Sequence, residues 1–253
     1  MRKPKPQQLL FAFADSPQGD GSDGGADASA WKSQPAPIAN SSQRSESAPP
    51  LAEGHDHLLE LVSDQHNLET ALARVVRNKG APGVDKQTVA EVVRNADHLL
   101  PKLRRALLTE SYMPGDVRRV WIPKPAGGQR GLGIPNVVDR LVQQAVLQIL
   151  ESIYDRTFHA SSHGFRPGRG AHTAIAEAAG YVKQGLRYTV DLDLEKFFDR
   201  VHHQRLLARL AEKVPDRRVL RIIRLMLKAK VVLPDGTRVS TEEGTPQGGP
   251  LSP

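Results

Sequence analysis

Two carboxylates two positions apart are the first residues in this chain whose types and spacing could do chemistry. Asp191 and Asp193 lie in residues 188–199, YTVDLDLEKFFD, which begin with the alternation of β-prone residues typical of a short strand. Residues two apart on a strand share a face, so both carboxylates point the same way. Burying a carboxylate costs free energy unless a cation or a donor compensates it, and Mg²⁺ takes oxygen ligands of this kind. On this stretch alone, an aspartate pair that caps the following turn is the favoured alternative.

Four further motifs favour the metal site over the capping aspartate pair. In chain order they are KGAPGVD (79–85), WIPKPAGGQRGLGIP (121–135), SSHGFRPGR (161–169) and GTPQGGPLSP (244–253). Together with DLDLEKFFD, which stands between the last two, they resemble the amino-terminal half of a group II intron reverse transcriptase of the bacterial maturase type. The resemblance runs from about residue 68 to residue 253. It implies a mixed α/β right-hand polymerase, with mostly helical fingers and a partial palm whose antiparallel sheet is incomplete.

The resemblance also implies a metal site. Asp193 would bind Mg²⁺, with Mn²⁺ as the alternative ion, and the backbone carbonyl of Leu194 would be a further ligand. Asp191 would be a supporting carboxylate. Phe198 follows Asp193 by five residues and would be the aromatic platform beneath the nucleotide sugar. Phe197 is the alternative platform, because a bulge shifts the register by one residue.

The next motif of the family, YxDD, carries two more metal-binding aspartates and does not occur in these 253 residues. The two-metal mechanism calls for three carboxylates, of which only Asp193 is present. We therefore expect an RNA-directed DNA polymerase represented by its amino-terminal portion, and a polypeptide that does not extend a primer by itself. The alternatives are a module that binds intron RNA and assists splicing, and an inactive truncated remnant.

A basic hairpin is predicted near the middle of the chain. Residues 117–122, VRRVWI, alternate like a strand and are followed by a glycine-rich loop and a second strand-like stretch, LGI. The hairpin carries Arg118, Arg119, Lys124 and Arg130 and no acidic residue. Such cations suit a triphosphate, since Arg makes forked and Lys point-charge contacts to phosphate oxygens. By resemblance, Lys124 and Arg130 hold the incoming dNTP, and Arg118 contributes.

The loop ahead of a predicted helix at residues 171–184 is a candidate RNA contact. Arg166 and Arg169 lie in this loop, and the free N–H groups at a helix amino terminus also favour an anion. We interpret His163, in the same loop, as structural. In the last ten residues, GTPQGGPLSP, small side chains would let a nucleotide or the primer and template approach the backbone closely. By resemblance, Gln247 belongs to the wall of the nucleotide pocket.

The elements that must position these residues are mostly helices. One-sided apolar spacing predicts helices over residues 56–80, 88–94, 96–110, 137–154, 203–213 and 217–230. Pro101 is expected to break or begin the third. The helix at 137–154 is the predicted core helix, and we expect Asp139 and Arg140 at its start to anchor the preceding loop. A turn signal, PDGT, predicts a second hairpin over residues 230–241.

Basic residues outnumber acidic ones in the part of the chain that is expected to fold. Residues 55–253 hold 30 Lys and Arg against 22 Asp and Glu, a net charge of +8. This excess predicts a polyanionic partner, most simply a nucleic acid, whereas a merely solvated basic surface is the alternative. By resemblance, the partners would be group II intron RNA, template RNA and a DNA primer. Between residues 200 and 230, ten basic residues stand against two acidic ones. We expect this helix pair to pack one face on the palm sheet and to leave the other free for a nucleic-acid backbone.

The first 54 residues differ in composition from the rest. They are rich in Gly, Ser, Pro and Ala and hold few large apolar side chains, which predicts a disordered tail. Residues 55–185 would then form an amino-terminal extension and the fingers, and residues 186–253 the partial palm. No stretch approaches the roughly 18 apolar residues of a membrane span, so we expect no membrane partner. The chain has no cysteine, which excludes disulfides and thiolate metal sites and fits a cytoplasmic protein.

Overall fold

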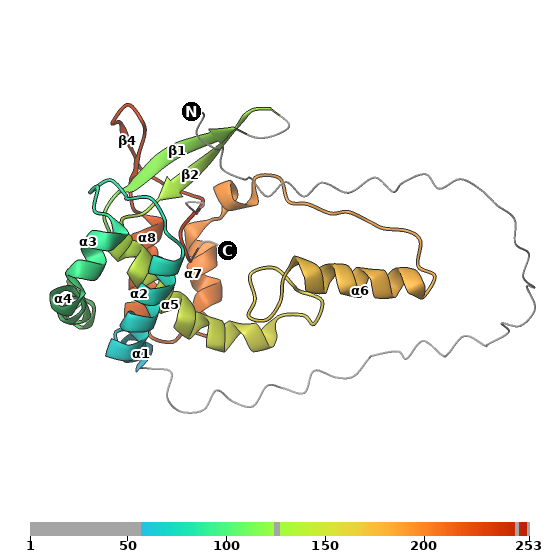
Figure 1. Cartoon of the computed structure of the whole chain (residues 1–253), viewed down its shortest axis with the longest axis horizontal. Helices are drawn as coiled ribbons and strands as arrows, with labels where there is room; N and C mark the ends of the chain where they lie inside the picture. The colour runs from blue at the N-terminus through green and yellow to red at the C-terminus, as the bar shows by residue number, and fades with distance from the viewer. Residues whose placement is uncertain (1–56, 124–126, 246–247, 252–253) are drawn as a thin grey trace, which may run out of the picture. The chain divides into compact units, whose positions relative to one another are not determined.

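The computed structural model describes residues 57–123, 127–245 and 248–251 (Figure 1). All of them belong to one compact unit, residues 48–253. The predicted disordered tail and two of the predicted nucleotide-binding residues, Lys124 and Gln247, lie outside the described residues. Within the described part of the chain, no helix is long and apolar enough to cross a membrane.

Four short helices open the described chain: α1 (Leu58–Val62), α2 (Gln65–Arg77), α3 (Val89–Arg94) and α4 (Ala96–Leu108). Asp64 and Thr88 cap α2 and α3, because their side chains accept hydrogen bonds from N–H groups of the first turn. The predicted break at Pro101 is wrong, since α4 runs through this exposed residue. Burial of one apolar stripe of α4 outweighs the lost backbone hydrogen bond. The stripe consists of Leu100, Leu103 and Leu107.

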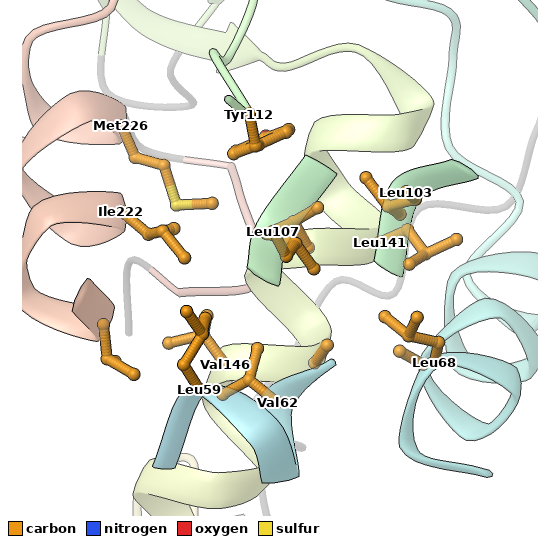
Figure 2. Packing of buried hydrophobic residues seen from close by; sticks show 14 of the residues in the cluster. Leu59, Val62, Leu68, Leu103, Leu107, Tyr112, Leu141, Val146, Ile222 and Met226 are labelled. Atoms are coloured by element: carbon orange, nitrogen blue, oxygen red, sulfur yellow. The ribbon is translucent and has the colours of Figure 1, made fainter. Parts of the chain in front are cut away.

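The core helix α5 (Val137–Tyr154) has the predicted bounds. Five of its apolar residues, Val137, Leu141, Val142, Ala145 and Val146, are fully buried, in a core shared with α1, α2, α4 and α8 (Arg217–Leu227). Figure 2 shows Leu59 and Val62 close to Val146, with Ile222 and Met226 of α8 directed toward the same cluster. The prediction that α8 packs on a palm sheet is therefore wrong. Its apolar face is used in the helical core instead, while α7 (His203–Ala211) packs beside it.

Both predicted hairpins are confirmed, and they join in one sheet. β1 (Val117–Pro123) pairs with β2 (Gln129–Ile134), and β3 (Val231–Val232) pairs with β4 (Arg238–Val239), each pair antiparallel. The strand order is β2-β1-β3-β4, with β1 and β3 parallel. The sheet is thus mixed, whereas the sequence predicted an antiparallel palm sheet.

The predicted strand at residues 188–193 is not formed. These residues have no strand partner in the part of the chain that the structure describes, and the side chains of Tyr188 and Leu192 are 100% and 88% exposed. A β ladder needs a paired neighbour, so alternation alone does not make a strand. The segment is preceded by α6 (Ala171–Lys183), which buries no residue, and is followed by a short 3₁₀ turn, η3 (Phe197–Arg200). A similar turn, η2 (Asp155–Thr157), follows α5.

Candidate functional site

The loop KGAPGVD is fastened to the start of α5. The side-chain carbonyl of Asn136 accepts hydrogen bonds from the backbone N–H groups of Val84 (3.0 Å) and Asp85 (3.3 Å). Arg140 donates from Nη2 to the carbonyl of Ala81 at 2.8 Å. Gly83 permits this close approach, because a Cβ atom there would lie 2.7 Å from the backbone of Asn136. Arg140 thus anchors a loop, but this loop is KGAPGVD and not the predicted one directly before α5.

Asp139 anchors the chain just before β1. Its carboxylate accepts hydrogen bonds from the Tyr112 hydroxyl (2.6 Å) and from the Gly115 N–H (3.0 Å), and the residue is only 5% exposed. Burial raises the pKa of Asp139 above its ordinary value, although hydrogen bonds from Tyr112, Gly115 and Asn136 oppose the shift. Asn136 follows β2 after one residue, Pro135. Both ends of the β1–β2 hairpin are therefore fixed at this junction.

The hairpin presents different cations on its two faces. Its register pairs Ile122 with Arg130 and Ile134 with Arg118, so Arg118 and Arg130 share one face. They lie four pairs apart, about 13 Å along the strand. Arg119 lies on the other face, where its guanidinium is 5.7 Å from the centre of the Trp121 ring. The hairpin thus brings two of the predicted nucleotide-binding residues onto a common face.

Arg118 and Gly131 lie on opposite faces of the hairpin and differ in their packing. The Nε atom of Arg118 is buried and has no hydrogen-bond partner among the described residues. A Cβ atom at Gly131 would lie 2.6 Å from Nη1 of Arg119 and 3.1 Å from the Trp121 ring. Glycine therefore makes room for the Arg119–Trp121 contact on the opposite face.

The GTPQGG motif connects the turn after the central aspartates to the hairpin. The N–H of Gly244 donates to the Val201 carbonyl and that of Thr245 to the Phe198 carbonyl, both at 2.8 Å. On the other side of the motif, Gly248 has a φ of 123°, and a Cβ atom there would lie 2.8 Å from the Gly133 carbonyl of β2. Glycine is required here because the backbone approaches the strand so closely.

The chain places Asp193, Leu194 and Phe198 around one small hollow of about 500 Å³. Asp193 is exposed, and its carboxylate accepts a hydrogen bond from the Leu194 N–H at 2.9 Å. The Phe198 ring contacts that of Phe197 edge to face, with centroids 5.4 Å apart. Asp193 and the two aromatic rings are thus neighbours, and the role of Phe198 as an aromatic platform stays a prediction.

Two oxygen groups at this hollow are of the type that binds metal ions. The Asp193 carboxylate and the Leu194 carbonyl are oxygen ligands of the kind that a hard divalent ion takes. The Leu194 carbonyl accepts a hydrogen bond from the Phe197 N–H at 3.3 Å, which leaves its second lone pair available. No group of three His, Cys, Asp or Glu residues that could hold a metal ion occurs among the described residues.

Arg166 is an internal organiser of its loop. Its Nε donates to the Asp155 carboxylate (2.7 Å), its Nη1 to the carbonyls of His159 (2.9 Å) and Ser162 (3.1 Å), and its Nη2 to the Asp155 carbonyl (3.0 Å). Four of its five N–H groups are therefore used inside the loop. Arg169 is more exposed and donates to the carbonyl of Ala160. Of the two predicted RNA contacts, Arg169 is the better presented.

The structural interpretation of His163 is confirmed. Its two ring nitrogens contact the Thr173 hydroxyl (2.9 Å) and the Glu177 carboxylate (2.8 Å), both on α6. Hydrogen bonds from Ser161, Tyr181 and His163 lower the pKa of Glu177 to about 2. His163 thus attaches α6 to the preceding loop.

Sequence reasoning missed Asn136 and Tyr112. A Pro-Asn pair directly before a strongly periodic helix signals a helix start, so Asn136 could have been found, although its side chain holds a distant loop and does not cap α5. Nothing in the sequence pairs Tyr112 with Asp139, 27 residues away. Only the fold brings these two side chains together.

A second, apolar cavity of about 480 Å³ lies beside the site. Aromatic residues from the loop after α5 and from η3 line it together with the apolar face of α8. Among the lining residues are Phe158, Phe165, Phe197, Phe198, Ile223 and Met226. The cavity is continuous with the packed side of α8 and carries few polar groups.

Helical fingers, a basic hairpin tied to a small-residue loop and an aspartate beside an aromatic pair are features of the right-hand polymerase fold. Residues 122–253 match the family model described as Reverse transcriptase (RNA-dependent DNA polymerase), and the chain belongs to this family. Members of the family depend on a divalent metal ion.

Several curated relatives are similar to the chain. Protein YkfC of Escherichia coli K12 is 36% identical over 206 residues, which cover 78% of this chain and 53% of YkfC. A putative COX1/OXI3 intron 2 protein of Saccharomyces cerevisiae is 32% identical over 196 residues, covering 78% and 23%. The group II intron-encoded protein LtrA of Lactococcus lactis is 38% identical over 162 residues, covering 62% and 26%. Some of the relatives are thus group II intron-encoded proteins. The chain spans about half of the relatives' length or less.

Solved structures agree on the fold. The chain is similar to a chain of the partial Cas6-RT-Cas1--Cas2 complex, with a TM-score of 0.50 and 21% identity, over 78% of this chain and 32% of that chain. At this identity the likeness supports the fold alone.

Proposed function

We propose that the chain is the amino-terminal portion of a group II intron reverse transcriptase, which extends a DNA primer on an RNA template with dNTP substrates. Residues 55–185 form its amino-terminal extension and fingers, and residues 186–253 begin its palm. The observation that carries the proposal is the contact of Gly248 with the Gly133 carbonyl, because it holds the GTPQGG motif against the basic hairpin. A nucleotide between the two would have cations on one side and the motif on the other.

The triphosphate of the dNTP is bound by the hairpin face that carries Arg118 and Arg130, together with Lys124 from the connecting loop. The guanidinium of Arg118 suits this role, since Arg makes forked hydrogen bonds to phosphate oxygens. Gln247 forms the wall of the nucleotide pocket. Phe198 lies beneath the sugar, where its ring would exclude a 2′-hydroxyl.

Mg²⁺ would be held by the Asp193 carboxylate and the Leu194 carbonyl, with Asp191 as a supporting carboxylate. When bound, the ion supplies activation of the primer hydroxyl and stabilisation of the leaving pyrophosphate. The residues of this chain orient the reactants: the hairpin holds the triphosphate, and the aromatic pair positions the sugar next to Asp193. Arg169 contacts the RNA backbone, and Arg166 keeps its loop in shape.

The hairpin assignment is tested in a chain completed with the carboxy-terminal part of Lactococcus lactis LtrA. Arg118→Ala and Arg130→Ala should each raise the KM for dNTP by about tenfold or more and leave RNA affinity nearly unchanged, because they remove contacts to phosphate. Arg119→Ala is the matched control, since Arg119 is adjacent in sequence but lies on the opposite face. If Arg118→Ala and Arg130→Ala weaken RNA binding and spare KM, the hairpin is a template clamp.

A second candidate function is an RNA-binding module without polymerase activity. The observation that favours it is that the described residues bring no three acidic or imidazole ligands together. Primer extension on an RNA template with Mg²⁺ or Mn²⁺ separates the two functions when it is measured on the chain completed with the carboxy-terminal part of LtrA, because only a polymerase portion supports extension there; residues 1–253 are measured alongside. We expect no extension by this polypeptide alone. Extension that disappears in Asp193→Ala would show that a single aspartate supports the chemistry.

A further inference from the structure

The exposed face of α8 carries four basic side chains in one line. Arg217, Arg221, Arg224 and Lys228 follow one another at intervals of four, three and four residues, which places them along a single stripe of the helix. The buried residues of α8 lie on the opposite side. The stripe, called the α8 ridge below, is about 16 Å long at a rise of roughly 1.5 Å per residue.

Neighbouring charges are neutralised by ion pairs away from the ridge. Arg218 donates to both carboxylate oxygens of Glu60, at 2.7 and 2.8 Å, and to the buried Asp216. Arg221 is partly engaged, because it donates to the Glu110 carbonyl at 2.8 Å and lies 3.9 Å from the Glu110 carboxylate. In the described part of the chain, three ridge residues have no acidic partner: Arg217, Arg224 and Lys228.

This arrangement is unfavourable for the helix itself. Like charges three or four residues apart repel, and a merely solvated helix surface mixes both signs. The apolar side of α8 already secures the helix in the core, so packing does not require the cations. A row of cations about 5 to 6 Å apart along a helix is complementary to a chain of phosphates.

The ridge faces away from the candidate site. Ile223, Met226 and Leu227, on the packed side of α8, line the same cavity as Phe198 and Thr245. A polyanion on the ridge therefore lies across α8 from this cavity and does not occupy the polymerase site.

We propose that the α8 ridge is a second nucleic-acid surface, which binds the phosphate backbone of structured RNA independently of base sequence. The choice of RNA rests on the proposed function, whereas the charge complementarity does not. The ridge anchors RNA outside the site while the hairpin and Asp193 serve the growing strand.

The test uses residues 1–253 and a fluorescent RNA hairpin, with affinity measured by anisotropy between about 50 and 200 mM salt. The triple variant Arg217→Gln, Arg224→Gln and Lys228→Gln should weaken binding about tenfold or more at 100 mM salt. The slope of log affinity against log salt should fall by about 2 to 3, because each lost phosphate contact removes roughly 0.7 to 0.9. The thermal midpoint should stay the same or rise, because repulsion is removed.

A triple variant next to the ridge provides the matched control. Arg205→Gln, Arg209→Gln and Lys213→Gln, in and just after α7, make the same change in charge. Arg209 already pairs with Glu212 at 3.0 Å, and Lys213 lies 5.1 Å from the centre of the Tyr154 ring. We expect less than about a threefold loss of RNA affinity. Equal losses in the two triple variants would overturn the proposal, because bulk charge would then account for both.

A charge reversal and a change of nucleic acid test the ridge further. A single Arg224→Glu reversal on the exposed face keeps the fold and should weaken RNA binding more than Arg205→Glu does; equal effects overturn the proposal.

A DNA duplex of the same sequence is the second arm. If the ridge variants affect only the DNA duplex, the assignment to RNA is wrong. Neither result depends on the KM of the hairpin variants, so the ridge and the polymerase function fail separately.

Discussion

The junction at the start of α5 and the segment around Asp193 each depend on an aspartate, but the two carboxylates have opposite surroundings. Asp139 is buried and accepts hydrogen bonds from Tyr112 and Gly115. Asp193 is exposed and accepts one from the adjacent backbone N–H, in a segment whose apolar side chains are exposed too. The difference teaches that the buried polar contacts of this chain position the hairpin, while the residue assigned to chemistry adds little to the fold. Mutation of Asp139 should therefore lower the stability of the fold, whereas mutation of Asp193 should affect the chemistry with little change in stability.

The largest effect is expected when the buried carboxylate is removed. Asp139→Ala should lower the free energy of unfolding by about 2 to 3 kcal/mol, because the buried Tyr112 hydroxyl and the Gly115 N–H lose their acceptor. Asp193→Ala should change it by less than about 0.5 kcal/mol, as for other exposed positions. Urea denaturation of both variants makes the comparison, with Asp191→Ala as an exposed control. Similar losses for Asp139→Ala and Asp193→Ala would break the contrast between the two regions.

A smaller effect is expected at the ion pair that joins α1 to α8. Arg218→Gln should lower the free energy of unfolding by about 1 to 2 kcal/mol, since Asp216 is buried but Arg218 and Glu60 are partly exposed. Denaturation by urea at neutral pH measures this loss. A value as large as that of Asp139→Ala would show that ion pairing, and not the α5 junction, dominates the polar stability of the core.

The pH dependence of Arg218→Gln tests whether Arg218 stabilises the fold through the ionised Asp216 carboxylate. Burial raises the pKa of Asp216, but hydrogen bonds from the Arg218 side chain and from the N–H groups of Leu59 and Arg218 outweigh it, so the pKa lies below its ordinary value of 3.8. A lowered carboxyl pKa stabilises the fold above the ordinary value, and this stabilisation is lost as the pH falls through the folded value. The difference in the free energy of unfolding between the parent protein and Arg218→Gln should therefore shrink below about pH 3.8. A difference that is constant with pH would mean that Arg218 acts by packing alone.

The smallest effect on global stability is expected at α6. His163→Ala should detach the 13-residue helix, because α6 buries no residue and His163 links it to its loop. Circular dichroism should report a loss of helix, while the urea midpoint of the core stays unchanged. A shifted midpoint would show that α6 belongs to the core.

Acid should act on α6 through Glu177. Its pKa of about 2, lowered by hydrogen bonds from Ser161, Tyr181 and His163, means that the attachment is complete above the ordinary value of 4.5 and is lost as the pH falls toward 2. Hydrogen exchange of α6 amides over this range measures the loss. Glu177→Gln is the control, and its exchange should be independent of pH once the intrinsic rate is taken into account.

Much of the fold could be predicted because its signals are local. The apolar period of residues 137–154 sets the bounds of α5, and the turn chemistry around PDGT and the glycine-rich loop sets both hairpins. The basic character of the hairpin follows from its sequence as well. Resemblance across five motifs indicated the family, to which the match over residues 122–253 assigns the chain.

Tertiary structure decided which partner each side chain meets. Arg166 is as basic in the sequence as Arg169, yet an acceptor-rich loop uses most of its donors. Residues 188–193 alternate like a strand, but a strand forms only where a neighbour supplies the ladder.

The sequence by itself determined the helices, the hairpins and the excess of positive charge, because periodicity, turn residues and composition act over a few positions. Only the tertiary structure decided that Asn136 holds Val84 and that Arg218 holds Glu60, 158 residues away. These contacts decide which basic side chains are bonded to groups inside the fold and which remain exposed on its surface. The physical reason is that hydrogen bonds and ion pairs are specific to geometry, and the chain brings such distant groups together only when its core packs.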